Sequence, residues 1–231
     1  MKTLLLGYGE VGKAIYENLK DKHEIDIISL GFEQLTRPIE ENCVLLVSIP
    51  YNDQFVKTVK EYQDKINPQA TIIFSTVAIG TSAELKAVHS PIEGKHPDLA
   101  KSFKIMKRWL GGYNPVASQF FFDAGIKVMD VPKPEYTEFL KMRSTSVYGL
   151  NIEFARYCKG VSENLGMPFD LTKDYDNDYN ELYTSMDMKR YGRYVLDAPT
   201  GPIGGHCVIP NAKILDNQYP SVFLKEIYRE K

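Results

Sequence analysis

The sequence predicts an α/β domain built on a doubly wound parallel sheet, followed by a smaller, all-helical domain. Short apolar runs alternate with helical stretches in the first half of the chain, and a glycine-rich segment joins the first run to the first helix. Pro132 and Pro134 then interrupt the pattern, and the remainder is helical in character. We therefore expect a first domain over residues 1–131 and a second over residues 132–231.

The elements of the first domain follow from its apolar pattern. Strands rich in Val, Ile and Leu are predicted at residues 3–6, 25–29, 43–49 and 71–75, with weaker strands at 86–89, 108–111 and 126–131. Apolar residues at helical spacing predict helices at residues 11–19, 55–66 and 115–123. Closely spaced strand-helix units of this kind are typical of a parallel sheet covered by helices.

The second domain is predicted to begin with one long helix over residues 135–165, ended by Gly166 and Pro168. The helix has more apolar surface than a small helical domain can cover, so we expect a homodimer. Residues 174–183 contain four acids and three tyrosines. We assign this polar segment to a loop or to the frayed start of a helix.

Composition argues against several classes of partner. The chain has 28 basic and 30 acidic side chains and a formal net charge of -2, which gives no electrostatic basis for binding nucleic acid or an anionic membrane. No apolar run approaches the roughly 20 residues that cross a bilayer. Cys43, Cys158 and Cys207 are widely separated, which indicates neither a disulfide framework nor a zinc site. We expect a cytoplasmic protein with a small-molecule substrate and no metal.

The glycine-rich segment G-Y-G-E-V-G, residues 7–12, lies between the first predicted strand and the first predicted helix. In a Rossmann fold such a loop turns backbone N–H groups and a helix N-terminus toward a pyrophosphate. Gly7 would allow the tight turn, Gly9 the approach of the phosphate, and Gly12 the packing of the helix on the strand. The predicted cofactor is therefore a nicotinamide dinucleotide. The predicted contacts of the loop are Gly7, Tyr8, Gly9, Glu10, Val11 and Gly12.

Ser29 stands at the end of the second predicted strand, where an acidic residue usually binds the adenosine ribose. A serine can bond a 2′-hydroxyl but does not repel a 2′-phosphate, and Arg37 follows within reach. We favour NAD and leave NADP open. The remaining cofactor contacts are predicted near the ends of later strands, at Ile49, Pro50, Ser75, Thr76 and Val77.

Two further segments resemble the UDP-glucose/UDP-N-acetylmannosamine dehydrogenase family. The segment S-T-V-A-I-G-T, residues 75–81, is similar to a turn near the nicotinamide, and G-P-I-G-G-H-C-V-I-P, residues 201–210, is similar to the family's cysteine loop. The order of features is also similar: a Rossmann domain, the turn, a long helix with a lysine, and the cysteine loop. The family continues into a second Rossmann-like domain, for which the sequence shows no counterpart. The wider relatives, the 6-phosphogluconate and β-hydroxyacid dehydrogenases, combine one Rossmann domain with a helical domain.

The resemblance implies roles for individual residues. Cys207 matches the family's nucleophile, and Lys141 matches the lysine of the central helix. Thr145 stands where the family has asparagine, and Asn211 where it has aspartate. Glu93 falls in a loop that faces substrate in the superfamily. The implied substrate contacts are Arg190, Arg193, Gly204 and Gly205.

These residues would suit the oxidation of an alcohol carbon on a sugar-like or anionic substrate. Oxidation to an acid needs two hydride transfers, and a Cys207 thiolate would hold the aldehyde as a thiohemiacetal and then as a thioester. Lys141 would stabilise the alkoxide or transfer a proton. Two alternatives stay open: a single-step β-hydroxyacid-type dehydrogenase that uses Lys141, and a dinucleotide-binding module without turnover.

Overall fold

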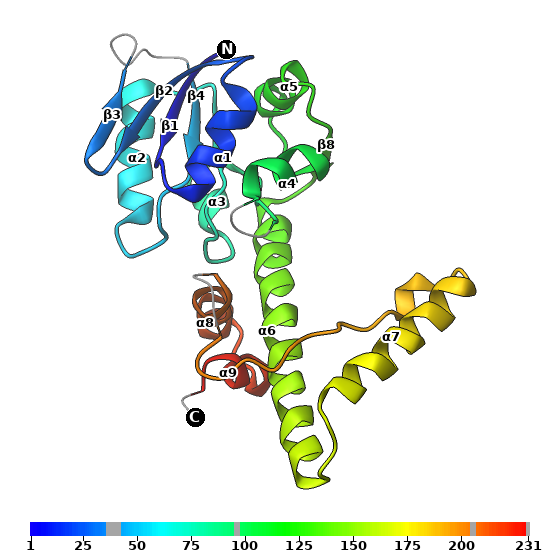
Figure 1. Cartoon of the computed structure of the whole chain (residues 1–231). Coiled ribbons are helices and arrows are strands. Elements are labelled where there is room, and N and C mark those ends of the chain that lie inside the picture. The colour runs from blue at the N-terminus through cyan, green and yellow to red at the C-terminus, as the bar shows by residue number, and fades with distance from the viewer. Residues whose placement is uncertain (36–42, 95–97, 204–206, 230–231) are drawn as a thin grey trace. The chain divides into compact units, whose positions relative to one another are not determined.

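The computed structural model describes residues 1–35, 43–94, 98–203 and 207–229 (Figure 1). The chain divides into two compact units, Met1–Lys141 and Met142–Lys231, and each is described by itself. None of the described helices is both long enough and apolar enough to cross a membrane.

The first unit is built on one sheet, in which eight described strands lie in the order β3-β2-β1-β4-β5-β6-β7-β8. The strands are β1 (Lys2–Leu6), β2 (Glu24–Ser29), β3 (Phe32–Gln34), β4 (Val44–Val47), β5 (Ala70–Ile73), β6 (Val88–His89), β7 (Arg108–Gly111) and β8 (Val128–Val131). The five central strands from β2 to β6 are parallel, while β3 pairs antiparallel with β2 and β7 antiparallel with β6. The predicted doubly wound sheet is confirmed.

The order of the strands fixes where a ligand site is expected. The chain starts in the middle of the sheet at β1, adds β2 on one side, and then returns to add β4 on the other side of β1. The loops after β1 and β4 therefore separate at the carboxyl ends of these strands, which is the usual binding position in open α/β sheets. Leu4–Leu6 of β1 and all of β4 are buried, as expected for strands covered on both faces.

The helices of the first unit are α1 (Glu10–Leu19), α2 (Phe55–Ile66), α3 (Thr81–Glu84), α4 (Leu99–Ile105) and α5 (Pro115–Asp123). Helices α1, α4 and α5 contribute to one apolar core and α2 to the other, so α1 and α2 cover opposite faces of the sheet (Figure 1). Helix α1 is tied to α4, since Asn18 Nδ2 donates to the Ala100 carbonyl at 2.9 Å. Asn114 caps α5, accepting from the backbone N–H groups of Val116 and Ala117.

The long helix α6 (Pro134–Asn164) confirms the helix predicted over residues 135–165. The division between the units falls inside α6, after Lys141, and so later than the expected boundary at residue 131. The physical reason is that the first two turns of α6 belong to the first unit. Thr137 bonds to His89 at the end of β6, and Glu138 and Lys141 bond to the segments that follow β5 and β6.

The rest of the second unit is helical, as predicted. Its elements after α6 are α7 (Asp170–Ser185), the 3-10 helix η1 (Lys189–Tyr191), α8 (Val208–Gln218) and α9 (Val222–Tyr228). Gly149 of α6 faces α8 and α9, where a Cβ would lie 2.8 Å from Val208 Cγ1 and 2.9 Å from Ile227 Cγ2. Arg156 of α6 donates to the Pro199 carbonyl at 2.9 Å and holds the segment that returns from η1.

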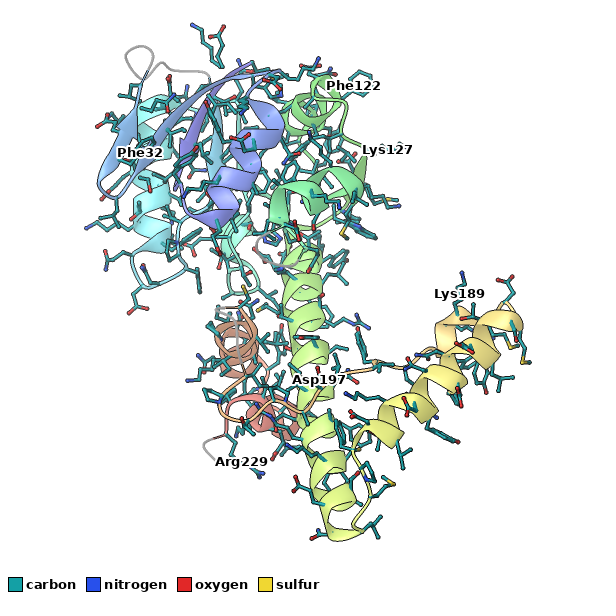
Figure 2. The ribbon with its side chains drawn as sticks, in the orientation of Figure 1. Phe32, Phe122, Lys127, Lys189, Asp197 and Arg229 are labelled. Atoms are coloured by element: carbon teal, nitrogen blue, oxygen red, sulfur yellow. The ribbon has the colours of Figure 1, made fainter. Side chains whose placement is uncertain are left out.

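The prediction that residues 174–183 form a loop or a frayed helix start is wrong, because they lie inside α7. The tyrosines of this segment recur at helical spacing, and two of them contact each other: the Tyr179 and Tyr183 ring centroids are 4.6 Å apart. Ion pairs also stabilise the helix, including the pair of Lys173 with Asp197. Asp197 is labelled in Figure 2. A polar segment of this kind remains helical because its acids stay solvated while its aromatic rings pack together.

Candidate cofactor and catalytic site

The glycine-rich loop connects β1 to α1 at the point where the strand order reverses. Gly7 has a φ of +97°, and a Cβ there would lie 2.7 Å from the Ser48 carbonyl oxygen of the β4 loop. A Cβ on Gly12 would overlap the Gly7 carbonyl oxygen. At Gly9, by contrast, a Cβ would meet no atom within 4 Å. The fold itself therefore requires glycine at positions 7 and 12, and leaves open space beside Gly9.

Helix α1 begins directly beside this open space. Gly9 is its N-cap, and no described side chain caps the helix there. Glu10 and Val11 form the first turn, with Glu10 exposed and Val11 half-buried. The first N–H groups of a helix have no partners within the helix, and the helix dipole places positive potential on them. This end of α1 is therefore suited to an anionic group.

Ser29 lies at the end of β2, next to the same loop. Its Oγ accepts a hydrogen bond from the Tyr8 backbone N–H at 3.1 Å, so the serine supports the glycine loop directly. The Tyr8 ring stacks on Phe32 of β3 with ring centroids 5.2 Å apart (Figure 2). Sequence reasoning missed Phe32, because a short exposed strand carries no periodic apolar signal. Arg37 lies outside the described residues.

Three loops meet at the carboxyl edge of β4, β5 and β6. Ser75 Oγ donates to the Ile49 carbonyl at 2.7 Å, which joins the loops after β5 and β4. Thr76 is half-buried, whereas the Val77 side chain is buried in the second apolar core. Val77 can therefore present only its backbone to a ligand. Pro50 is exposed beside Ile49.

His89, at the end of β6, connects this edge to α6. Its ring is fully buried, with Nε2 3.2 Å from the Ser75 carbonyl oxygen and Nδ1 2.8 Å from Thr137 Oγ1. Burial lowers the pKa of His89 to about 3, and the positive charge of Lys141 acts in the same direction. The ring is thus neutral, with its proton on Nε2, because a carbonyl oxygen can only accept. Among the described residues, no cluster of histidine, cysteine and acidic side chains could hold a metal ion.

The structure brings Lys141 and Glu93 together, both within the first unit. Lys141 Nζ donates to the Ile92 carbonyl at 2.6 Å and lies 3.3 Å from Glu93 Oε2. The side chains are 13% and 29% exposed, so the pair is partly screened from water. An ammonium group held by two oxygens at the carboxyl edge of a parallel sheet can stabilise a developing alkoxide.

Arg108, the first residue of β7, is a second cation at this edge that the sequence analysis missed. Its guanidinium is fully buried, donates to the Pro91 carbonyl at 3.2 Å and lies 4.7 Å above the Phe103 ring centroid. Burial lowers the pKa of Arg108 to about 10, and the Glu93 carboxylate opposes that shift. The loop that carries Glu93 is therefore anchored by a buried positive charge.

In the second unit, Cys207 is half-buried at the N-cap of α8. Asn211 lies one turn into this helix, and its Nδ2 donates to Thr145 Oγ1 at 3.2 Å. Thr145 and Asn211 are the two positions at which the sequence differs from the family that it resembles, and the structure places their side chains in contact. Gly204 and Gly205 lie outside the described residues.

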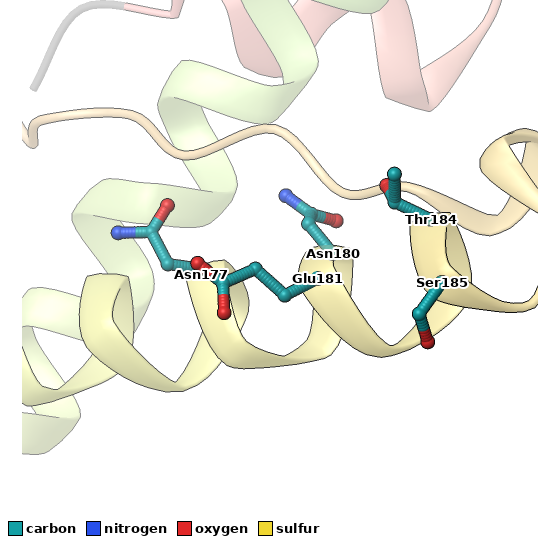
Figure 3. A pocket seen from close by; sticks show the side chains of 5 residues that line it. All are labelled: Asn177, Asn180, Glu181, Thr184 and Ser185. Carbon is teal, nitrogen blue, oxygen red and sulfur yellow. The ribbon is translucent and has the colours of Figure 1, made fainter.

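Arg190 and Arg193 lie in and just after η1. Arg193 pairs with Asp176 Oδ1 at 3.2 Å and lies 3.6 Å above the Tyr179 ring centroid, while Arg190 donates to the Tyr191 hydroxyl at 3.1 Å. The described contacts of Arg193 are with α7, and that of Arg190 is within η1. A hollow on α7 contains none of the predicted site residues (Figure 3). It is lined by the polar side chains of Asn177, Asn180, Glu181, Thr184 and Ser185.

The sequence matches no family model and none of the curated proteins with which it was compared. Solved structures do match. A UDP-D-ManNAc dehydrogenase from Pyrococcus horikoshii is 12% identical with a TM-score of 0.78, and the match covers 99% of this chain and 66% of that one. A UDP-glucose dehydrogenase from Pyrobaculum islandicum is 16% identical with a TM-score of 0.75, covering 99% and 67%. The chain has the fold of the UDP-sugar dehydrogenases.

The expected resemblance is therefore confirmed at the level of the fold. The chain spans about two thirds of the length of these enzymes. A 3-hydroxyisobutyrate dehydrogenase from Mycobacterium tuberculosis is 14% identical with a TM-score of 0.59, and there the match covers 98% of both chains. The whole chain thus also matches a hydroxyacid dehydrogenase from end to end.

Proposed function

We propose that this protein is an NAD(P)-dependent oxidoreductase that acts on an alcohol carbon of a small, sugar-like or anionic substrate. The observation that carries the proposal is the open space beside Gly9. The structure explains the glycines at positions 7 and 12 by conformation and packing, but nothing described within the chain requires a glycine at position 9. A ligand phosphate that approaches the backbone at the N-terminus of α1 accounts for it.

The described residues fit a nicotinamide dinucleotide. The N-terminus of α1 would hold the pyrophosphate, and Ser29 would lie beside the adenosine ribose. The loops after β4 and β5, joined by the bond from Ser75 to Ile49, would flank the nicotinamide. When bound, the nicotinamide accepts a hydride from the substrate carbon. We propose NAD as the physiological form, because the Ser29 side chain can bond a 2′-hydroxyl and carries no positive charge that would attract a 2′-phosphate.

Lys141 is proposed as the residue that stabilises the substrate oxygen as its hydroxyl loses a proton. The Ile92 carbonyl and the Glu93 carboxylate hold its Nζ, so the ammonium keeps one position as the alcohol oxygen loses its proton. The Glu93 carboxylate would accept the hydroxyl proton while the Lys141 ammonium stabilises the alkoxide, and Glu93, being partly exposed, would pass the proton to water. Both groups lie in the first unit, so this step does not depend on how the two units are placed.

Cys207 is proposed to retain the aldehyde for a second oxidation. Cys207 is the N-cap of α8 and is half-buried, so its thiol is partly accessible at the start of that helix. The thiolate would add to the aldehyde carbon to give a thiohemiacetal. If a second, oxidised nicotinamide replaces the first, it would supply the acceptor for the second hydride and the thiohemiacetal would become a thioester, which water would hydrolyse to the acid and the free thiol. The proposed products are one acid and two reduced nicotinamides per alcohol.

A single-step dehydrogenase that uses only Lys141 is the second candidate. The contact between Asn211 and Thr145 favours it, because neither side chain is a carboxylate that could activate water for thioester hydrolysis. The full-length match to a hydroxyacid dehydrogenase supports the same candidate. A dinucleotide-binding module without turnover is the third, since the open N-terminus of α1 and Ser29 would also serve cofactor binding alone.

The experiment that separates the three candidates is the stoichiometry of NADH formed with a panel of sugar alcohols, nucleotide sugars and hydroxyacids. Two NADH per substrate support the thioester route, and one NADH supports the single-step route. A protein that binds NADH but forms none from any substrate supports the module without turnover. Lys141→Met should reduce turnover about 100-fold or more while keeping NADH affinity. Lys57→Met, which removes a lysine of α2 whose side chain is 72% exposed, is the matched control and should retain full activity.

We also propose that the protein is cytoplasmic. The support is its cysteine usage, since Cys43, Cys158 and Cys207 are widely separated in the sequence, which fits a reducing compartment.

A further inference from the structure

Glu138 is a buried carboxylate in the second turn of α6. Its side chain is fully buried, and its two oxygens accept from two backbone N–H groups: Oε2 from Gly80 at 2.7 Å and Oε1 from Ser82 at 2.8 Å. Both donors lie where the S-T-V-A-I-G-T turn enters α3. The glutamate thus closes the far end of that turn, more than fifty residues away in sequence.

The near end of the turn is fixed as well. Ser75 bonds to the Ile49 carbonyl, and its own carbonyl accepts from His89. Between these two anchors Thr76, Ala78 and Ile79 are half-buried, so this stretch of backbone lies at the surface of the first unit. A turn that is held at both ends and half-buried between them presents a fixed surface to a ligand.

Helix α6 contacts the S-T-V-A-I-G-T turn through Glu138 and carries Lys141 three residues later. Thr137 bonds to His89, Glu138 bonds to the turn, and Lys141 bonds to the Ile92 carbonyl. Residues three apart on a helix lie on one side of it. A shift of the turn relative to α6 would therefore change the distance from the turn to the Lys141 ammonium.

We propose that Glu138 is a positioning residue, which sets the spacing between the nicotinamide-facing turn and Lys141. The inference rests on the proposed function, because it takes the turn to face the nicotinamide. The geometry requires a carboxylate: both of its oxygens accept, whereas a glutamine amide would turn an N–H donor toward one of the two N–H groups. Burial raises the pKa of the Glu138 carboxyl, which disfavours its charged form, and the hydrogen bonds from Gly80 and Ser82 act in the opposite direction. The charged carboxylate is therefore stabilised by the turn that it binds.

The test compares Glu138→Gln with Glu84→Gln, which alters an exposed glutamate of α3 that pairs with Lys60 at 2.7 Å. Three quantities are measured: amide hydrogen exchange of residues 80–82, NADH affinity by fluorescence titration, and kcat. Glu138→Gln should speed exchange of the Gly80 and Ser82 amides about 10-fold or more. It should lower kcat about 10- to 100-fold, because misplacement of the reacting groups is costly. NADH affinity should stay within about twofold, since the pyrophosphate loop is untouched. Glu84→Gln should change none of the three.

Several results would overturn the inference. They are unprotected Gly80 and Ser82 amides in the parent protein, unchanged exchange in Glu138→Gln, and faster exchange with an unchanged kcat. A drop in kcat that parallels an equal loss of NADH affinity would show a general structural role and would also overturn it. If Glu138→Gln fails to fold, Glu138→Asp keeps the charge but is too short to reach both amides, and the same outcomes apply. A parent protein that neither binds NADH nor oxidises any alcohol defeats the proposed function itself, which separates that failure from this one.

Discussion

His89 shows how burial fixes a protonation state at the residue scale. The folded protein holds the pKa of His89 near 3, whereas the unfolded chain has an ordinary value near 6.5. As pH falls below about 6.5 the unfolded chain gains a proton that the folded chain does not, so the free energy of unfolding falls toward pH 3. His23, whose pKa burial also lowers, acts in the same direction. Glu138, whose pKa burial raises, acts oppositely above about pH 4.5.

His89→Gln keeps a donor for the Ser75 carbonyl but removes the titrating ring. The slope of unfolding free energy against pH, measured with urea between pH 4 and 6.5, should become shallower by up to about 1.4 kcal/mol per pH unit. His23 stays in both proteins, so its contribution cancels in the comparison. Equal slopes would show that His89 is protonated within the fold.

Cys207 and Cys158 form an internal comparison, because both are half-buried thiols. Cys158 lies within α6, where burial raises the pKa of its thiol. Cys207 lies at the N-cap of α8, where the first backbone N–H groups have no partners within the helix. Iodoacetamide should therefore modify Cys207 faster than Cys158, and buried Cys43 slowest, as followed by peptide mass spectrometry. Modification of Cys207 at or below the Cys158 rate would remove the thioester route and leave the single-step reaction.

The site divides into residues that local pattern predicts and residues that it does not. The glycine loop, Ser29, Lys141 and Glu93 follow from motif and position along the chain. His89, Arg108 and Glu138 do not, because their roles arise from burial and from bonds to residues far away in the sequence. In the sequence alone, a charged residue that the fold buries cannot be distinguished from a charged residue at the surface.

At the scale of elements, long apolar or periodic segments are predictable and short ones are not. Helices α2 and α5 have the predicted bounds, and strand β7 does as well. Strand β3 and helices α3 and α4 were not predicted, since each is too short for periodicity to show and β3 is exposed throughout. Helix α7 was assigned wrongly because its stability comes from ring contacts and ion pairs rather than from an apolar stripe.

Two glycines of α6 give a prediction about how this helix packs. Gly160→Ala meets open space and should stabilise the protein by roughly 0.5–1 kcal/mol through helix propensity. Gly149→Ala would overlap the branched side chains of Val208 and Ile227, and should destabilise it by about 1 kcal/mol despite the same propensity gain. Urea unfolding of both variants measures the difference. Equal stabilisation by the two changes would mean that α8 and α9 do not pack against Gly149.

At the scale of the whole molecule, uncovered apolar side chains support the proposed homodimer. Phe154 and Tyr157 of α6 and Leu165, the residue after it, are 65%, 68% and 71% exposed, and no residue of α7 is buried. Such a surface is typical of a subunit interface. Sedimentation at micromolar concentration should give a dimer, and Phe154→Ser should shift it toward monomer. A parent protein that sediments as a monomer would contradict the proposal.

The central claim is that the open space beside Gly9 holds the phosphates of a nicotinamide dinucleotide. Fluorescence titration with NADH, carried out on the parent protein and on Gly9→Val, tests it most directly. A valine there meets no atom of the chain through its Cβ, so the protein should still fold, with the unfolding free energy lowered by about 1 kcal/mol at most because valine is a poorer N-cap than glycine. NADH affinity should fall about 10-fold or more because the side chain occupies the phosphate position. Equal affinity in the two folded proteins, or a parent protein that does not bind NADH, would contradict the account.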